Sequence, residues 1–199
     1  MKSKRVEYFK KSSKGRTLDL GCDFGLLHSL LDDGKMLGLD ISNENYKERV
    51  IKGNVLKMPI KDASLDTVIA GELLEHMPGS APLLKECSRI LRKNGTLLIS
   101  TPNKKAWSNR LFHHFDHASA EEEYPHQNVL DGKSLREECE KFFEVKEFFY
   151  LPYDEVSSPN RFTQKGMRAA NLFYPIRKIV HNLVPKEMGE QMVIKCQKK

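Results

Sequence analysis

The stretch LDLGCDFG, residues 18–25, decides how the chain is expected to fold. Its first half completes a short apolar run, RTLDL (16–20), which reads as a buried strand. Gly21 and Gly25 then allow a tight turn into a helix, expected over residues 25–33 because its leucines recur at helical spacing. A glycine-rich turn between a strand and a helix is typical of a ligand-binding loop.

A second buried strand, KMLGLD (35–40), strengthens this interpretation because it ends in Asp40, 21 positions beyond Asp19. An acidic residue about 20 positions after a glycine-rich turn is placed to accept hydrogen bonds from ribose hydroxyls. Both features fall at the carboxyl ends of strands, where ligands bind in this type of sheet. The residues therefore predict an adenosine-containing ligand. A doubly wound protein whose turns are merely structural is the alternative.

Outward from this stretch, predicted strands and helices alternate along the chain. The further strands are expected at VIKGN (50–54), LDTVIAG (65–71), GTLLIST (95–101), FEVKEFFYLP (143–152) and EQMVIKC (190–196), with helices over 82–93 and 133–143. Asn94-Gly95 is expected to end the first of these helices. Apolar strands separated by helices indicate an α/β, doubly wound fold whose parallel sheet is covered on both faces.

In these segments the sequence resembles the class I S-adenosylmethionine-dependent methyltransferases of the type 11 group. The similar stretches occur in order: LDLGCDFG, GLDIS (38–42), GNVLKMPIKDASLDTVIAGELLEHM (53–77) and LLKECSRILRKNGTLLISTPN (83–103). The resemblance implies a mostly parallel, seven-stranded, Rossmann-like sheet with helices on both faces. It also implies S-adenosyl-L-methionine as methyl donor and S-adenosyl-L-homocysteine as product.

The resemblance also implies roles for individual residues. Asp19 would approach the methionine part of the cofactor, Asp40 would hold the ribose hydroxyls, and Ile41 would lie against the adenine. The full set of implied cofactor-binding residues is Asp19, Gly21, Cys22, Asp23, Gly25, Asp40, Ile41, Asn54, Val55 and Glu72.

Two of these residues depart from the family pattern. Asp23 stands where the family usually has glycine, and it adds a negative charge near the expected position of the cofactor's cationic groups. Asn54 stands where an acidic residue commonly accepts a hydrogen bond from the adenine amino group. Because an asparagine carbonyl accepts the same bond, we expect the binding mode to be retained.

His76 is the candidate catalytic residue, because it follows the strand 65–71 where the acceptor would approach. A hydroxyl or amine acceptor needs a base to remove its proton during methyl transfer. The alternative role for His76 is to cap a helix. We expect methylation of a small-molecule or lipid-linked acceptor at oxygen.

The same segment, ELLEH (72–76), allows a second hypothesis. Glu72, Glu75 and His76, together with His126, offer carboxylate and imidazole ligands for a divalent metal, which would replace the general base. We assign no metal to the site and leave this hypothesis open. The imidazoles at His113, His114 and His117 favour a solvated or substrate-facing loop.

The chain of 199 residues has a formal net charge of +6, which invites a nucleic-acid interpretation. The excess lies at the two ends, however: residues 1–16 carry +6, residues 161–199 carry +7, and the body between them is acidic. RNA methylation therefore stays a less favoured alternative, beside a cofactor-binding protein without catalysis. The basic, partly apolar segment 161–186 would meet a membrane surface or pack against the domain.

We expect a single domain over residues 1–199, with a basic extension at 1–15 and variable substrate or cap segments at 104–130 and 153–187. The four cysteines lack the paired spacing of a disulfide scaffold or a zinc site, so we expect free thiols. Without a secretory signal or an 18-residue apolar run, the sequence favours a cytoplasmic protein. The oligomeric state is not predicted.

Overall fold

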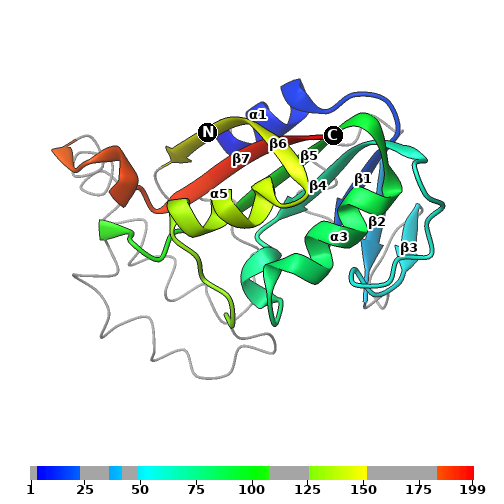
Figure 1. Cartoon of the computed structure of the whole chain (residues 1–199), viewed down its shortest axis with the longest axis horizontal. Coiled ribbons are helices and arrows are strands. Elements are labelled where there is room, and N and C mark those ends of the chain that lie inside the picture. The colour runs from blue at the N-terminus through cyan, green and yellow to red at the C-terminus, as the bar shows by residue number, and fades with distance from the viewer. Residues whose placement is uncertain (1–3, 23–35, 42–48, 108–125, 152–182) are drawn as a thin grey trace.

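The computed structural model describes residues 4–22, 36–41, 49–107, 126–151 and 183–199. In this part of the chain, seven strands form one sheet in the order β3-β2-β1-β4-β5-β7-β6 (Figure 1). The strands are β1 Thr17–Leu20, β2 Leu37–Asp40, β3 Val50–Lys52, β4 Leu65–Gly71, β5 Leu91–Pro102, β6 Phe143–Leu151 and β7 Gln191–Lys198.

The first five strands of this sheet pair in parallel, and β7 runs antiparallel to both of its neighbours, β5 and β6. The prediction of a mostly parallel, seven-stranded sheet is confirmed. The parallel strands β1, β2, β4 and β5 all end at one edge of the sheet, and the antiparallel β7 begins there, since Gln191 pairs with Pro102. This carboxyl edge positions the candidate site.

Alternating side chains of the central strands build two separate cores. Val68 and Ala70 of β4 belong to the larger apolar cluster, whereas Ile69 between them belongs to the smaller one. The same alternation recurs in β5 and β7. Because successive residues of a strand point to opposite faces, the two clusters lie on the two faces of the sheet.

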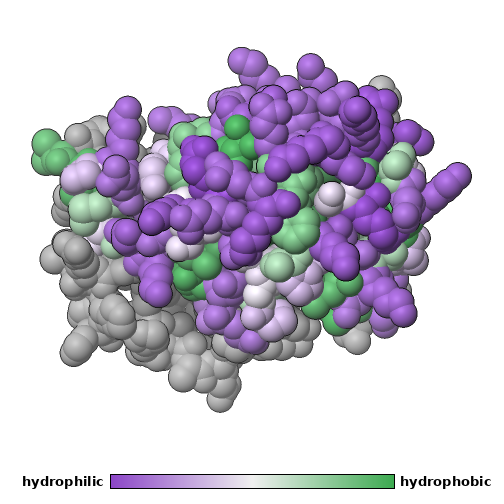
Figure 2. Space-filling model, in the orientation of Figure 1, coloured by the Kyte–Doolittle hydropathy of each residue, from purple (hydrophilic) through white to green (hydrophobic). Residues whose placement is uncertain are grey.

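Helices α3 (Ser80–Ile90) and α5 (Gly132–Glu140) cover the larger cluster through their apolar residues. The viewer's side of Figure 1 carries both helices, and Figure 2 shows mainly hydrophilic residues on the surface of that side. Helix α1 (Lys4–Ser12) covers the smaller cluster, where Phe9 is fully buried. Two short 3-10 helices, η1 (Leu74–His76) and η3 (Lys186–Met188), complete the described elements.

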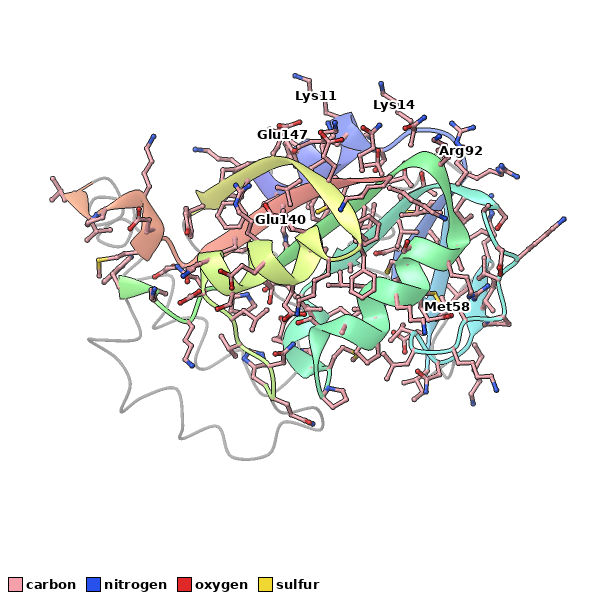
Figure 3. All side chains as sticks on the ribbon, viewed as in Figure 1. Lys11, Lys14, Met58, Arg92, Glu140 and Glu147 are labelled. Atoms are coloured by element: carbon pink, nitrogen blue, oxygen red, sulfur yellow. The ribbon has the colours of Figure 1, made fainter. Side chains whose placement is uncertain are left out.

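Helix α1 is the main difference from the sequence expectation. Residues 1–15 were expected to form a basic extension, but α1 buries Arg5 and Phe9. The other basic residues of the segment fit the expectation better, since Lys11 and Lys14 point away from the body of the molecule (Figure 3). Apolar burial of Phe9 against strands of the sheet explains why this charged segment docks.

The end of α3 also differs from the prediction. The helix stops at Ile90, four residues before Asn94, and β5 starts at once, because Leu91 pairs with Leu65 of β4. The register then shifts before regular pairing resumes at Thr96, and Asn94 takes a left-handed φ of 61° in the irregularity. Asn94-Gly95 therefore shapes a bulge inside β5 and does not end the helix.

All four cysteines are buried, and none of them forms a disulfide. None of the described helices is long and apolar enough to cross a membrane. Several predictions lie outside the described residues: the helix at 25–33, Asp23, Gly25, the histidines at 113, 114 and 117, and most of segments 104–130 and 153–187, including 161–182.

Candidate functional site

The turn after β1 is built on Gly21, which has a left-handed φ of 62°. Its N–H donates a 2.8 Å hydrogen bond to the carbonyl of Leu39, which ties the end of β1 to β2. A Cβ at this position would lie 2.8 Å from the side chain of Leu73. The neighbouring Cys22 is buried, and its side chain packs on Gly38.

Two predicted acidic residues lie on adjacent strands near this turn. Asp19 of β1 is 1% exposed, and Asp40, which ends β2, is also buried. Burial raises the pKa of Asp19 to about 8, with a further upward contribution from Asp40 and a downward one from the guanidinium of Arg5. A buried carboxyl that is costly to ionise alone is suited to accept a cationic ligand.

Ile41 follows Asp40 and is 58% exposed, which is unusual for a large apolar side chain in this structure. An exposed isoleucine directly beside a buried acidic residue offers an apolar surface to a planar ring and a hydrogen-bond acceptor to a sugar. The adenine and ribose assignments of Ile41 and Asp40 are compatible with this placement.

Asn54 and Val55 contribute to the fold as well as to the expected adenine site. The side-chain oxygen of Asn54 accepts a 2.8 Å hydrogen bond from the N–H of Leu56, and its carbonyl accepts one from the N–H of Lys57. Asn54 thus shapes the turn after β3. Val55 is buried in the larger cluster. A ligand that bound the side-chain oxygen of Asn54 would share this acceptor with the N–H of Leu56.

Glu72 directly follows β4 and has a left-handed φ of 54°, a strained conformation for a residue with a side chain. Its N–H donates to the carbonyl of Ser100 on β5. Its Oε1 lies 3.0 Å from Nη1 of Arg5 and accepts a 2.9 Å hydrogen bond from the amide of Gln191. The carboxylate is therefore fixed from α1 and from β7.

Glu75, His76 and His126 form a second group at this edge. Each offers one ligand atom, and the three atoms lie within 4.8 Å of one another. The two imidazole rings meet edge to face, with centroids 4.9 Å apart. Glu72, the fourth residue of the metal hypothesis, does not belong to this group and is instead held by Arg5 and Gln191.

Glu75 is buried, and its Oε2 accepts a 3.0 Å hydrogen bond from the hydroxyl of Thr101. Burial raises the pKa of Glu75 to about 8, and the nearby Glu72 adds to the rise. Its backbone carbonyl accepts hydrogen bonds from the N–H groups of Gln127 and Asn128, which holds the chain around His126 against η1. This contact explains how a residue 50 positions downstream comes to lie beside His76.

Sequence reasoning missed the partners that hold these residues: Arg5, Ser100, Thr101 and Gln191. Val6 and Phe9 recur at a helical spacing in the basic N-terminus, and that spacing was the available signal for α1. No local pattern pointed to Gln191, because its contact with Glu72 joins positions 119 residues apart.

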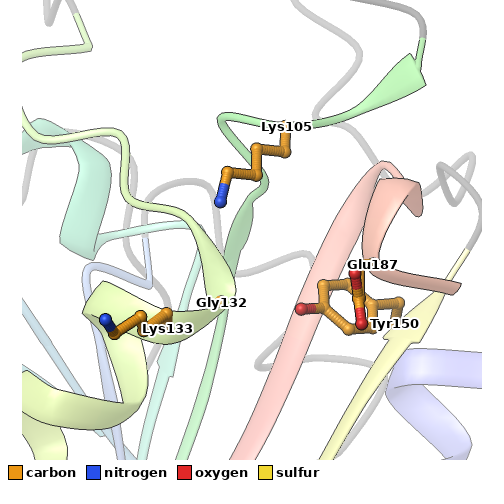
Figure 4. A pocket seen from close by; sticks show the side chains of 5 residues that line it. All are labelled: Lys105, Gly132, Lys133, Tyr150 and Glu187. Carbon is orange, nitrogen blue, oxygen red and sulfur yellow. The ribbon is translucent and has the colours of Figure 1, made fainter.

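A cavity of about 300 Å³ is lined by Lys105, Gly132, Lys133, Tyr150 and Glu187 (Figure 4). Lys105 extends into the space shown in the figure, and its ammonium pairs with Asp131 at 2.9 Å. Lys105 belongs to the variable segment 104–130 and Glu187 to the segment 153–187, so the cavity joins two segments that were expected to contact substrate.

The region that matches a known protein family spans most of strands β1 to β5. A family described as "Methyltransferase domain" matches residues 18–99. A protein named as a probable S-adenosylmethionine-dependent methyltransferase from Mycolicibacterium smegmatis is 32% identical over 101 residues, which cover 46% of this chain and 39% of that protein. A ubiquinone biosynthesis O-methyltransferase from Sodalis glossinidius is 28% identical over 127 residues, 52% of this chain and 50% of the enzyme.

Similarity to solved structures extends over nearly the whole chain. The structure of a SAM-dependent methyltransferase from Thermotoga maritima superposes with a TM-score of 0.68 at 19% identity, covering 98% of this chain and 88% of that one. The fold is thus the Rossmann-like methyltransferase fold. The chain spans about half or less of the length of the curated relatives that it matches here.

Proposed function

We propose that the chain is a class I S-adenosylmethionine-dependent methyltransferase of the type 11 group and that it methylates an oxygen of a small-molecule or lipid-linked acceptor. The observation that carries the proposal is the gathering of Gly21, Asp40 and Glu72 at the carboxyl edge of β1, β2 and β4. In a doubly wound sheet this edge is the ligand-binding edge.

The residues at this edge fit the three parts of S-adenosylmethionine. Asp40, which is buried, would accept hydrogen bonds from the ribose hydroxyls, and the exposed Ile41 would lie against the adenine. The carboxylates of Asp19 and Glu72 balance the positive charge of the methionine part. Gly21 lets the backbone approach without a Cβ, which would collide with Leu73. Cys22 contributes its backbone, and Asn54 and Val55 frame the adenine edge.

The bound cofactor supplies an activated methyl group, so the protein's task is to align an acceptor and manage its proton. The acceptor oxygen would take the methyl group as the carbon–sulfur bond breaks, and the hydroxyl proton would pass to a base. His76 is the proposed base, since it is half-buried and lies next to His126 at the same edge. The products are the methylated acceptor and S-adenosylhomocysteine.

The polar cavity beside Lys105 is the proposed position of a polar part of the acceptor. Charges of both signs line it, from Lys105 and Lys133 on one side and Glu187 on the other. The relationship to a ubiquinone biosynthesis O-methyltransferase supports oxygen as the methylated atom and a small molecule as the acceptor.

Calorimetry with S-adenosylmethionine and S-adenosylhomocysteine tests the cofactor assignment. Asp40→Ala is expected to weaken binding by about 1–3 kcal/mol, because ribose hydroxyls lose their acceptor. Glu137→Ala is the matched control, since Glu137 is an exposed acidic residue on α5, and its affinity should equal that of the wild type. Absence of binding by the wild-type protein at millimolar ligand would refute the function. Binding without turnover on any acceptor would favour a cofactor-binding protein.

The group formed by Glu75, His76 and His126 supports a second candidate for the proton step. One carboxylate and two imidazoles match the ligands of Zn²⁺, Mn²⁺ and related ions, and their ligand atoms lie within 4.8 Å of one another. A bound ion would lower the pKa of the acceptor hydroxyl and replace His76 as the base. Turnover that is abolished by a chelator and restored by Mn²⁺, Mg²⁺ or Zn²⁺ would support this candidate, and unchanged turnover in chelator would contradict it.

A further inference from the structure

The cavity beside Lys105 lies beyond the expected cofactor residues along the carboxyl edge of the sheet. Lys105 comes three residues after β5, Tyr150 is the last residue but one of β6, and Glu187 precedes β7 by four positions. The ends of β5 and β6 both pair with Gln191, the first residue of β7, so these three segments meet at one edge. The cofactor residues stand at the ends of β1, β2 and β4. A ligand in the cavity would therefore be a neighbour of the cofactor and not a part of it.

A short stretch of chain joins the cavity to the proposed base. His126 lies beside His76, and Gly132, six residues later, lines the cavity. The N–H of Lys104 donates a 2.9 Å hydrogen bond to the carbonyl of Leu130, which holds this stretch against the segment that follows β5. Because six residues span at most about 20 Å, an acceptor of that length or shorter is enough to reach from the cavity to the proposed base.

One buried side chain fixes both walls of the cavity. Asn103 is 1% exposed, and its amide nitrogen donates hydrogen bonds of 2.9 Å to the carbonyl of Glu187 and 2.7 Å to that of Gly189. Its side-chain oxygen accepts a 3.0 Å hydrogen bond from the N–H of Lys105. The backbones that carry the cation of one wall and the carboxylate of the other are thus held by the same residue.

The protein neutralises the charges of these walls only in part. The ammonium of Lys105 pairs with Asp131 at 2.9 Å and keeps two further N–H donors. Among the described residues, Glu187 has no ion-pair partner. Figure 4 shows Glu187 and Tyr150 on the side of the space opposite Lys105. Burial raises the pKa of Tyr150 and Glu187 adds to the rise, so its hydroxyl stays protonated and can donate.

The two signs of charge decide which kind of group fits. A purely anionic group would be attracted by Lys105 and Lys133 and repelled by Glu187, and a purely cationic group would meet the reverse. An apolar group would desolvate all three charges without replacing their hydrogen bonds to water. A group that carries both signs is complementary to both walls.

We propose that the cavity binds a zwitterionic group of the methyl acceptor, in which an ammonium lies a few bonds from a carboxylate or a phosphate. Lys105, Lys133 and the hydroxyl of Tyr150 receive the anionic part, and Glu187 receives the ammonium. The volume of about 300 Å³ is at the lower end for ligand pockets, so it suits one group of the acceptor. The proposal rests on the proposed function and names the class of its acceptor, whose hydroxyl would lie toward His76.

NMR titrations of the isotope-labelled protein test this recognition with three matched probes, each of which carries a hydroxyl. L-Serine has both charges, ethanolamine lacks the carboxylate, and β-hydroxypropanoate lacks the ammonium. Shifts of the backbone N–H signals of Lys105, Gly132 and Glu187 report binding in the cavity. L-Serine is expected to bind at least about tenfold more tightly than either probe with a single charge.

Two substitutions separate the walls, both at exposed residues. Glu187→Gln should weaken binding of L-serine about tenfold without weakening that of β-hydroxypropanoate. Lys105→Met should weaken binding of L-serine and of β-hydroxypropanoate without weakening that of ethanolamine. Glu144→Gln and Lys146→Met are the matched controls, because they remove the same charges from an exposed pair on β6 that does not line the cavity. Both controls should bind all three probes like the wild type.

A second matched pair, glycerophosphoethanolamine and glycerol phosphate, identifies the source of the zwitterion. Tighter binding of glycerophosphoethanolamine than of L-serine supports a lipid headgroup, and the reverse order supports a free amino-acid-like acceptor. A probe with a single charge that binds as tightly as both zwitterions overturns the proposal, as does the absence of binding by every probe at tens of millimolar. Wild-type protein that binds L-serine in the cavity but not S-adenosylmethionine would overturn the proposed function, whereas the opposite result overturns this proposal alone.

Discussion

Two residues at adjacent strand ends, Gly21 after β1 and Glu72 after β4, share a left-handed backbone conformation. Glycine adopts it without steric cost, and a glutamate adopts it only under constraint. Both turns allow the chain to leave the sheet at the edge where the ligand is expected. The glycine was predicted from its pattern, whereas the strain at Glu72 is visible only in the structure.

Gly21→Ala is therefore expected to destabilise the protein by about 2 kcal/mol or more. The change combines a left-handed φ, which costs about 1 kcal/mol, with a Cβ placed 2.8 Å from the Leu73 side chain. Gly79→Ala is the matched control, because a Cβ there meets nothing within 4 Å. Urea denaturation of both variants measures the difference. Equal stability of the two would show that the turn tolerates a side chain.

At the scale of whole elements, the strands were predicted well because buried parallel strands are continuous apolar runs bounded by turn residues. β4 matches its predicted bounds, and α5 and β6 match theirs within a few residues. α3 ended earlier than predicted, because pairing of Leu91 with Leu65 overrides the local helical pattern. α1 was not predicted as an element, since its charge concealed the helical spacing of Val6 and Phe9, which pack in the smaller cluster.

The docking of α1 predicts a measurable contribution from Phe9. This side chain is fully buried among Met36, Ile69, Leu98 and Val193, so Phe9→Ala should lower the free energy of unfolding by about 3–5 kcal/mol. Phe9→Leu keeps most of the apolar volume and should cost less than about 1.5 kcal/mol. Chemical denaturation should show one cooperative transition in each case. A midpoint that Phe9→Ala leaves unchanged would mean that α1 is an independent extension.

At the scale of the whole molecule, the candidate site joins residues from near both ends of the chain. The sequence predicted Gly21, Asp40 and Glu72 because each stands at the carboxyl end of a recognisable strand. It did not predict their partners, because Arg5 and Gln191 meet Glu72 only through the packing of α1 and the antiparallel insertion of β7. On α1, Lys4, Lys10 and Lys11 are therefore exposed, whereas Arg5 is buried and pairs with Glu72.

Placing acidic residues inside the fold also makes stability depend on pH. The pKa of Asp19 is raised by burial to about 8, whereas an aspartate in the unfolded chain titrates near 4. Between these values the folded protein holds a proton that the unfolded chain has lost, so the stability that this group contributes at acid pH is lost as pH rises through about 8. Glu75 acts in the same direction.

Asp19→Asn removes one of these protons and should flatten the decline in unfolding free energy between pH 5 and 7.5 by about 1.4 kcal/mol per pH unit. Asp66→Asn is the control of opposite sign: hydrogen bonds from Arg16 lower the pKa of Asp66, so its contribution is lost only toward acid pH. In the window from pH 5 to 7.5, Asp66→Asn should shift stability by a constant and leave the slope intact. Urea denaturation of the ligand-free proteins at several pH values measures both slopes. An Asp19→Asn slope equal to that of the wild type would mean that Asp19 is ionised in the folded state and carries its negative charge before any cofactor binds.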